Sequence, residues 1–331
     1  MRLFAPIPCG YHACFTSVRG SPVKKIAWSI VALLCIALGY TMLVAIPVEA
    51  IHNAERSAVT TTPAAVGLAF EDFVVTPQDN ELQLAGWWMP ADNARATLVF
   101  IHGGGSNRTS NYFGSLGFYR AMVDRGVSIA VVDLRNHGES GDDGHGLQFG
   151  RSERYDAQAA IEWARKKTPQ LPLFAMGISM GGATLIQAAH HGARLDGLIL
   201  LDSLLDTADT FKQGAFVATG LPAALFAASA WAATAFYGLP TGEEQALERA
   251  AELDIPILAI QDPDDPVTRA RYSRELAQRN PHVTLWTAPV IDLHHPDLAW
   301  KKRWGTHVSA FLFHPRETMA QIMAFIDALS Q

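Results

Sequence analysis

Cysteine is scarce in this chain of 331 residues: Cys9, Cys14 and Cys35 are its three cysteines, and all lie near the start. The remainder of the chain needs no disulfide, and cysteine usage does not identify a redox compartment. Positive charge is not in excess, since 26 Lys and Arg against 32 Asp and Glu give a formal net charge of −6. Without a basic stripe, nucleic acid is not expected as a partner. We find no internal repeat.

Charge is also missing from one long N-terminal stretch. Residues Ile26 to Val48 are apolar, and this length matches the roughly 20 residues that span a bilayer as a helix. Four basic residues precede it, which places the N-terminus in the cytoplasm and the rest outside: Arg2, Arg19, Lys24 and Lys25. The sequence predicts a short tail over 1–25, an uncleaved single-pass anchor over 26–48 and an Ala/Thr/Pro-rich stem over 49–69.

A cleaved signal peptide is the competing interpretation of the same run. Val48-Glu49-Ala50 could serve as a small-residue cleavage site, which would release a secreted or periplasmic protein. The apolar run is longer than a typical signal-peptide core of about 7–15 residues, which favours the anchor.

The most informative motif is Gly177-Ile178-Ser179-Met180-Gly181, which fits Gly-x-Ser-x-Gly. A strand-like run precedes it and a helix-like run follows it, as in a nucleophile elbow. Glycines two residues either side of Ser179 allow the close backbone approach that such a turn requires. The sequence therefore predicts Ser179 as a catalytic nucleophile, rather than as a cap on a buried helix.

Backbone donors for an oxyanion are expected from two places. One is the N–H group of Met180, directly after the nucleophile. The other is Gly104 in the loop His102-Gly103-Gly104-Gly105, which follows the apolar β-rich run 97–101. Neither a Gly-Lys-Ser/Thr ending nor a Gly-x-Gly-x-x-Gly spacing is present, so a phosphate cradle explains this loop less well.

The turn Asp133-Leu134-Arg135-Asn136-His137-Gly138-Glu139-Ser140 follows another buried strand. Together with His102-Gly103 and the Ser179 elbow, it resembles the α/β-hydrolase superfamily, although Asn136 stands where a glycine is more usual. The resemblance covers about residues 70–331. It implies an α/β fold, with a mostly parallel sheet and helices on both faces, preceded here by one transmembrane helix. It also implies structural roles for His137, Gly150, Glu153 and Asp156.

The resemblance also implies a catalytic acid after the apolar strand 255–260. In the family the acid stands three residues before a valine, which selects Asp264 in Gln261-Asp262-Pro263-Asp264-Asp265-Pro266-Val267. Gln261 replaces the usual glycine, so Asp265 and Asp262 stay open as alternatives. With no histidine in ligand spacing, we do not expect these carboxylates to bind a metal.

A histidine must take the proton of the serine, and three candidates follow the last strand-like run, 283–288. The segment around His307 resembles the terminal loop and closing helix of the family, and His307 is the predicted base. His294 and His295 are nearer to the strand, inside an insertion over 289–303 that departs from the family pattern.

The family places a cap between its sixth and seventh strands, and here this slot covers about residues 203–253. It contains residues 213–241 without one charge. Gly220 and Pro222 interrupt the run, so a hydrophobic cap is favoured over a second membrane span. Its apolar residues could line an acyl pocket, touch the membrane surface or pack on the core: Phe216, Leu221, Leu225, Phe226, Trp231, Phe236 and Tyr237.

These observations predict a membrane-anchored serine hydrolase that cleaves an ester or thioester of an acyl or lipid type through an acyl-enzyme. No cofactor is implied, and the oligomeric state stays open. Two alternatives remain: a serine peptidase of the aminopeptidase type, and a non-catalytic binding protein that keeps the hydrolase fold.

Overall fold

The structure of the protein is a computed structural model that describes residues 22–53 and 55–330. Most of the predicted tail over 1–25, including Cys9 and Cys14, lies outside these residues. The described residues form two units that divide between Met42 and Leu43. The first helix, α1 (Pro22–His52), contributes residues to both units.

Helix α1 contains the predicted anchor. Its stretch Pro22–Ile51 contains an 18-residue window with a mean hydropathy of 2.4 and is long and apolar enough to cross a membrane. This property is shared by single-pass anchors and by signal sequences. The helix continues beyond the predicted end at Val48, to His52, and the predicted limits of tail, anchor and stem stay predictions.

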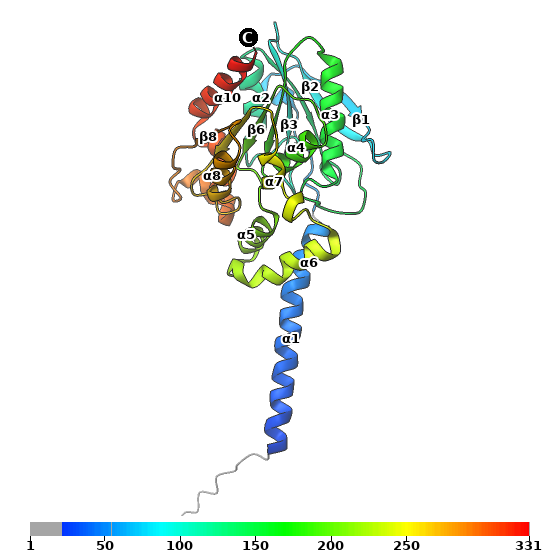
Figure 1. Ribbon diagram of the computed structural model, residues 1–331, viewed down its shortest axis with the longest axis vertical. Coiled ribbons are helices and arrows are strands. Elements are labelled where there is room, and N and C mark those ends of the chain that lie inside the picture. The colour runs from blue at the N-terminus through cyan, green and yellow to red at the C-terminus, as the bar shows by residue number, and fades with distance from the viewer. Residues whose placement is uncertain (1–21, 54, 331) are drawn as a thin grey trace, which may run out of the picture. The chain divides into compact units, whose positions relative to one another are not determined.

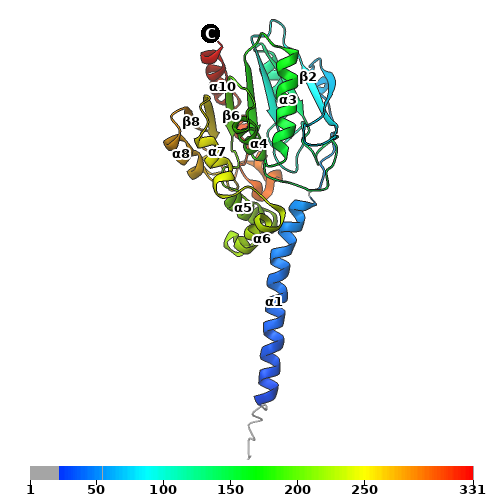
Figure 2. The same cartoon turned by 45° about the vertical axis from the view of Figure 1, so that its right-hand side comes forward.

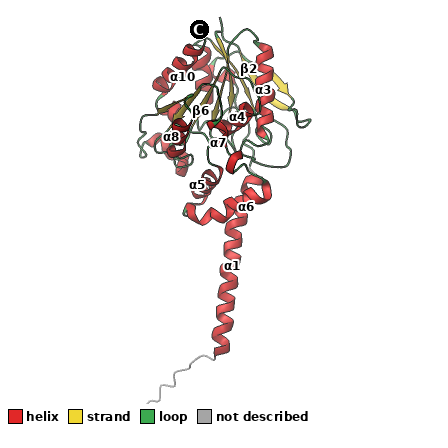
Figure 3. Cartoon of the chain, in the orientation of Figure 1, coloured by secondary structure: helices red, strands yellow, loops and turns green. Residues whose placement is uncertain are grey.

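The larger unit is built on one eight-stranded sheet of order β1-β2-β4-β3-β5-β6-β7-β8 (Figures 1 and 3). Strand β2 is antiparallel to both β1 and β4, and all other neighbours are parallel. The predicted mostly parallel α/β sheet is confirmed. Its strands are β1 (Glu71–Val75), β2 (Leu84–Met89), β3 (Ala96–Ile101), β4 (Val127–Val132), β5 (Leu173–Ile178), β6 (Gly197–Leu201), β7 (Ile257–Gln261) and β8 (Val283–Thr287).

The central strands read as continuous apolar runs because helices bury both of their faces. In β3, Val99 and Ile101 belong to one core cluster, while Leu98 and Phe100 belong to the other. The first cluster contains residues of α3 (Glu153–Lys167), α4 (Met180–His190), α7 (Ala246–Ala251) and α8 (Ala270–Arg279). The second contains residues of α2 (Ser115–Val123) and α10 (Pro315–Leu329). Figure 1 labels the helices of both layers, and Figure 2 shows most of them from another side.

The predicted cap region is helical and begins directly after β6. It consists of α5 (Thr207–Thr219), η2 (Ala223–Phe226), α6 (Ala227–Tyr237), η3 (Gly242–Glu244) and α7. Gly220 ends α5 in a left-handed conformation, with φ of 78°, so the charge-free stretch is broken where the sequence indicated. Phe226 is buried, whereas Trp231 and Phe236 are exposed.

The insertion before the predicted histidine base forms the 3-10 segment η4 (Pro296–Trp304), followed by α9 (Ala310–Phe313) and α10. A further 3-10 turn, η1 (Pro63–Val66), lies ahead of β1 in the predicted stem. Strands β5 to β8 are parallel, so their carboxyl ends lie at the same end of the sheet. The loop after η4 lies at this end, where β5 and β7 also end.

Candidate active site

Ser179 lies between β5 and α4 in a backbone conformation that few residues adopt. Its φ of 52° and ψ of −122° define a sharp strand-to-helix turn, and such a conformation costs about 1–3 kcal/mol. A Cβ on Gly177 would lie 2.4 Å from the oxygen of Gly181, and one on Gly181 would lie 2.3 Å from the oxygen of Ile101. Only glycine fits at both positions, which explains why the motif has these two glycines.

His307 reaches Ser179 from the loop after η4. Its Nε2 atom lies 3.0 Å from the Ser179 Oγ atom, within hydrogen-bond distance, and its side chain is almost completely buried. By contrast, the side chain of His294 is exposed, and His295, directly before η4, packs against Phe313 at the end of α9. The structure therefore places His307 beside Ser179, and it places neither His294 nor His295 there.

The carboxylate beside the histidine is Asp265, which corrects the choice of Asp264. Asp265 Oδ2 lies 2.7 Å from His307 Nδ1, and the Asp265 side chain is buried. Asp264 is exposed, and its N–H group donates to Asp262 Oδ1 in a tight turn. This turn directs the side chain of Asp264 to solvent and the next one inward.

Gln261, at the position where the family has a glycine, shapes this turn with its side chain. Its Nε2 atom lies 3.0 Å from Asp202 Oδ1 and also 3.0 Å from the carbonyl oxygens of Asp262 and Thr268. Asp265 Oδ1 accepts from the N–H groups of Val267 and Thr268. Asp262 is buried nearby, and desolvation raises its pKa to about 6.

Asp202, at the end of β6, is a buried carboxyl that sequence reasoning missed. Its Oδ2 accepts from the N–H group of Val308, next to His307, and its Oδ1 accepts from that of Asp262. Desolvation, with the charges of Asp265 and Asp262 added, raises the pKa of Asp202 well above its usual range. Its place directly after an apolar strand was the signal that could have indicated it.

Lys301 is a second residue that the sequence did not indicate. It lies in the insertion, is fully buried, and donates to the carbonyl oxygens of His307 at 2.7 Å and Tyr112 at 3.0 Å, and to Ser309 Oγ. Desolvation lowers the pKa of this ammonium group to about 8. The insertion thus holds the backbone on both sides of Val308 in place.

The loop after β3 lies against the elbow. A Cβ on Gly103 would be 3.2 Å from Ser179 Cβ, and one on Gly104 would be 3.2 Å from Met180 Sδ. Among the backbone hydrogen bonds of turns, loops and helix caps in the described part of the chain, none is donated by the N–H group of Gly104 or Met180. Met180 begins α4, where helix N–H groups lack partners and the helix dipole favours negative charge.

Two buried histidines hold this loop. His102 Nε2 accepts from the Leu134 N–H group, and His137 Nε2 accepts from that of Gly105. Desolvation lowers the pKa of His102 to about 4 and that of His137 to about 3, so both rings are neutral near pH 7. A neutral imidazole ring can accept such a hydrogen bond. The contact of His137 is therefore consistent with the structural role predicted for it.

The polar turn after β4 and the loop that follows it are anchored by two acidic residues in the first turn of α3. Arg135 is buried and pairs with Asp156 at 2.7 Å, while Glu153 accepts from the Gly150 N–H group at 3.0 Å. Desolvation raises the pKa of Glu153 to about 7. Asn136 adopts φ of 63°, a left-handed conformation that asparagine tolerates better than most residues, and so replaces the usual glycine.

Within the described residues, one group of potential metal ligands lies at this site: Asp202, Asp265 and His307, whose ligand atoms lie within 4.8 Å of one another. The Asp265 and His307 atoms already contact each other, and both Asp202 oxygens accept backbone N–H groups. These potential ligand atoms therefore already have hydrogen-bond partners within the protein. Ser179, His307 and Asp265 form a Ser–His–Asp hydrogen-bonded series.

Solved structures share this architecture. An esterase of Pyrococcus furiosus, Pf2001, superposes with a TM-score of 0.66 over 83% of this chain and 96% of the esterase, at 22% identity. The α/β hydrolase GrgF from a Penicillium species gives a TM-score of 0.56 over 80% of this chain and 99% of its own, at 15% identity. The predicted α/β-hydrolase fold is therefore confirmed.

Sequence comparison agrees with the fold. The profile of the family described as Serine aminopeptidase, S33, matches residues 92–236, a segment that includes the Ser179 elbow. The chain thus has the α/β-hydrolase fold, and its segment 92–236 is similar to this family.

Two curated relatives show the same relationship. YfhR of Escherichia coli K12 is 30% identical over 130 residues, which cover 37% of this chain and 43% of YfhR. Human monoglyceride lipase is 25% identical over 166 residues, which cover 48% of this chain and 52% of the lipase. The aligned segments thus cover about half of each relative.

Proposed function

We propose that this protein is a serine hydrolase that cleaves a carboxylic ester or thioester of an acyl or lipid type through an acyl-enzyme on Ser179. The observation that carries the proposal is the series Ser179 Oγ, His307 Nε2, His307 Nδ1 and Asp265 Oδ2, with contacts of 3.0 and 2.7 Å. A serine hydroxyl needs such a base, and the base needs a carboxylate that fixes its tautomer.

In this mechanism Ser179 Oγ attacks the carbonyl carbon while its proton passes to His307 Nε2. Asp265 accepts the Nδ1–H hydrogen bond and stabilises the imidazolium ring. The oxyanion that forms lies against the N–H groups of Gly104 and Met180. Its collapse breaks the bond to the alcohol or thiol, which leaves with the proton of His307. Water, deprotonated by His307, then hydrolyses the acyl-enzyme by the same steps.

The preference for an acyl substrate has two supports. The cap is apolar and uncharged over 213–241, and it begins directly after β6, next to the site. Monoglyceride lipase is also among the relatives. A serine peptidase is the second candidate, because the family profile carries the description of a serine aminopeptidase.

A fluorophosphonate probe is expected to label the full-length protein in detergent, and Ser179→Ala should abolish the labelling without changing thermal unfolding. A Ser203→Ala control, which alters a nearby serine outside the proposed series, should still be labelled. Acyl esters of graded chain length should be cleaved faster than aminoacyl amides. Faster cleavage of the amides would favour the peptidase, and labelling of the Ser179→Ala protein would contradict the proposed nucleophile.

We further propose that α1 remains attached as an anchor, with the N-terminus cytoplasmic. Residues after Met42 are part of the catalytic unit: Val48 is buried in its core, Ser229 Oγ donates to the Leu43 carbonyl at 3.2 Å, and Leu147 N–H donates to that of Ile51. Cleavage after Ala50 would remove Leu43 and Val48 and uncover the apolar surface against which they pack.

The protein is therefore expected to stay with membranes after a carbonate wash and to be degraded when intact spheroplasts are treated with protease. Recovery of a soluble form that begins near Ile51 would establish cleavage instead. Protection of the catalytic unit in spheroplasts, followed by degradation after lysis, would reverse the proposed orientation.

A further inference from the structure

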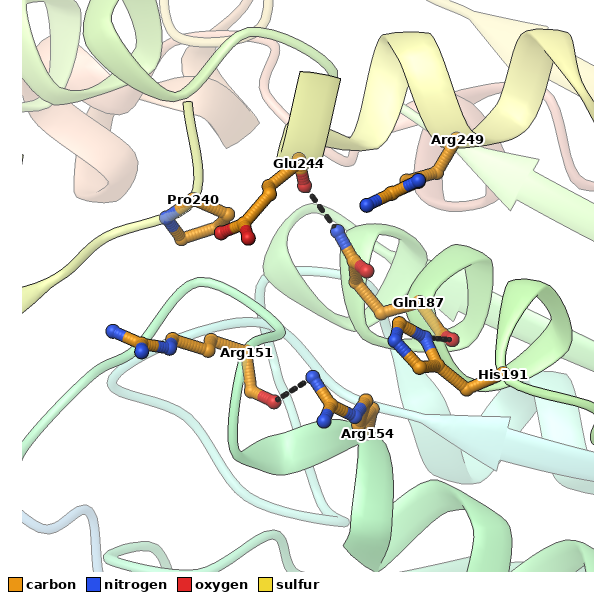
Figure 4. Close-up of a pocket in the computed structure, with 7 residues that line it drawn as sticks. All are labelled: Arg151, Arg154, Gln187, His191, Pro240, Glu244 and Arg249. Carbon is orange, nitrogen blue, oxygen red and sulfur yellow. Dashed lines mark hydrogen bonds between the residues drawn. The ribbon is translucent and has the colours of Figure 1, made fainter. Parts of the chain in front are cut away.

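A polar cavity of about 220 Å³ lies on α4 and the chain that returns from the cap, distinct from the Ser179 site (Figure 4). Its size is below the 300–1,000 Å³ of pockets for drug-sized ligands, so it suits a small ion or head group. Seven residues line it, and three of them are arginines: Arg151, Arg154, Gln187, His191, Pro240, Glu244 and Arg249.

The positive charge of this cavity is poorly compensated. Within the described residues, Arg151 donates to the Gly238 carbonyl, and Arg154 donates to the Arg151 carbonyl and the Tyr155 hydroxyl and lies over the Tyr155 ring. Neither arginine pairs with a carboxylate there. Among the residues that the structure describes, Arg249 pairs with a single carboxylate, that of Glu252, at 3.8 Å. Glu244 is the one carboxylate in the lining, so three guanidinium groups face one carboxylate.

Two of these guanidinium groups also have a free donor. The Nε atoms of Arg154 and Arg249 are buried and have no hydrogen-bond partner among the described residues. A buried donor without an acceptor destabilises the protein, and more so when the group is charged. An anion with several oxygens would satisfy such donors, and guanidinium groups bind phosphate-like oxyanions well because their donors are arranged as a fork.

We propose that this cavity is a binding site for a small oxyanion of the phosphate type, held by Arg154 and Arg249 with Arg151 at its rim. The ligand would be inorganic phosphate or the phosphate of a phosphomonoester head group. Arginines from two separate segments, residues 151–154 and α7, come together here, and an anion relieves the repulsion among them.

The position of the cavity connects it to the cap. Arg151 donates to the carbonyl of Gly238, the residue that ends α6, at 2.7 Å. Gln187 donates to the carbonyl of Glu244 at 2.6 Å. Lining residues thus hold both ends of the segment 238–244, which leads back from the cap, and a bound anion would restrain this segment.

The test uses full-length protein in detergent, with phosphate binding measured by calorimetry at constant ionic strength. Saturable binding is expected for the parent protein and for Ser179→Ala, so the result does not depend on the proposed hydrolase activity. Arg154→Gln and Arg249→Gln should each weaken binding about tenfold or more, whereas Arg249→Lys should retain part of it. Arg274→Gln changes an exposed arginine of α8 outside the lining and should have no effect.

Two further measurements complete the test. Phosphate should slow hydrogen exchange over 238–244 in the parent and in Arg274→Gln, but not in Arg154→Gln. Glycerol 3-phosphate, compared with inorganic phosphate, identifies the source: tighter binding of the ester indicates a phosphomonoester head group, and equal or weaker binding indicates free phosphate. The proposal is overturned if phosphate does not bind saturably, or if the two arginine-to-glutamine variants bind it as the parent does.

Discussion

Replacing His307 with alanine is expected to lower kcat for ester hydrolysis by about 10⁶-fold, as removal of a triad histidine does in a serine hydrolase. His307 Nε2 lies 3.0 Å from Ser179 Oγ, and without it no other ring nitrogen among the described residues contacts that hydroxyl. The measurement is the hydrolysis rate of a short acyl ester at saturating substrate, with thermal unfolding used to verify that the variant folds.

His294→Ala and His295→Ala are the matched controls for this prediction. Both lie in the insertion, and neither contacts Ser179 in the structure. Each variant should keep kcat within a few-fold of the parent, with any effect confined to KM. An inactive His294→Ala or His295→Ala protein beside an active His307→Ala protein would transfer the role of base to the insertion.

Asp265→Asn is expected to lower kcat by about 10⁴-fold, the loss that follows when the triad acid becomes an amide. The Asn side chain can present an N–H group to His307 Nδ1, which favours the wrong tautomer of the ring. It also removes the charge that stabilises the imidazolium ion. Asp265 Oδ2 is 2.7 Å from His307 Nδ1, so this contact is lost directly.

Asp264→Asn is the control, because it makes the same chemical change one residue earlier in the chain. Its side chain is exposed and its backbone N–H group, which contacts Asp262, is kept. The Asp264→Asn variant should therefore have nearly the parental kcat. The proposed arrangement fails if the two variants exchange these results, with Asp264→Asn inactive and Asp265→Asn active.

The order of strands, turns and motifs was predictable from local sequence. Buried parallel strands are continuous apolar runs, and a tight strand-to-helix turn needs small residues, so the runs before His102 and Gly177 indicated both the sheet and the elbow. The resemblance to the α/β-hydrolase superfamily rested on the same residues. Their spacing along the chain is part of the sequence, and no distant contact was needed to recognise them.

Which carboxylate lies beside His307 was decided by tertiary structure. Adjacent residues in a turn point in different directions, and the side chain of Gln261, through contacts with Asp202 and Thr268, sets which one points inward. The pattern of a glycine-containing turn therefore selected Asp264, although Asp265 faces His307. Spacing along the chain cannot show whether Asp264 or Asp265 points inward when Gln261, which shapes the turn, replaces the usual glycine.

Burial of single polar groups was likewise invisible in the sequence. Lys301 lies in the insertion, next to Lys302 and Arg303, yet its ammonium group is buried and donates to the carbonyl oxygens of His307 and Tyr112. The fold, the elbow and the candidate histidines were predictable from the sequence, because its local motifs carry the resemblance to the α/β-hydrolase superfamily. Only the tertiary structure decided which carboxylate contacts His307 and that the Lys301 ammonium group is buried, because both depend on contacts between residues that are not neighbours in the sequence.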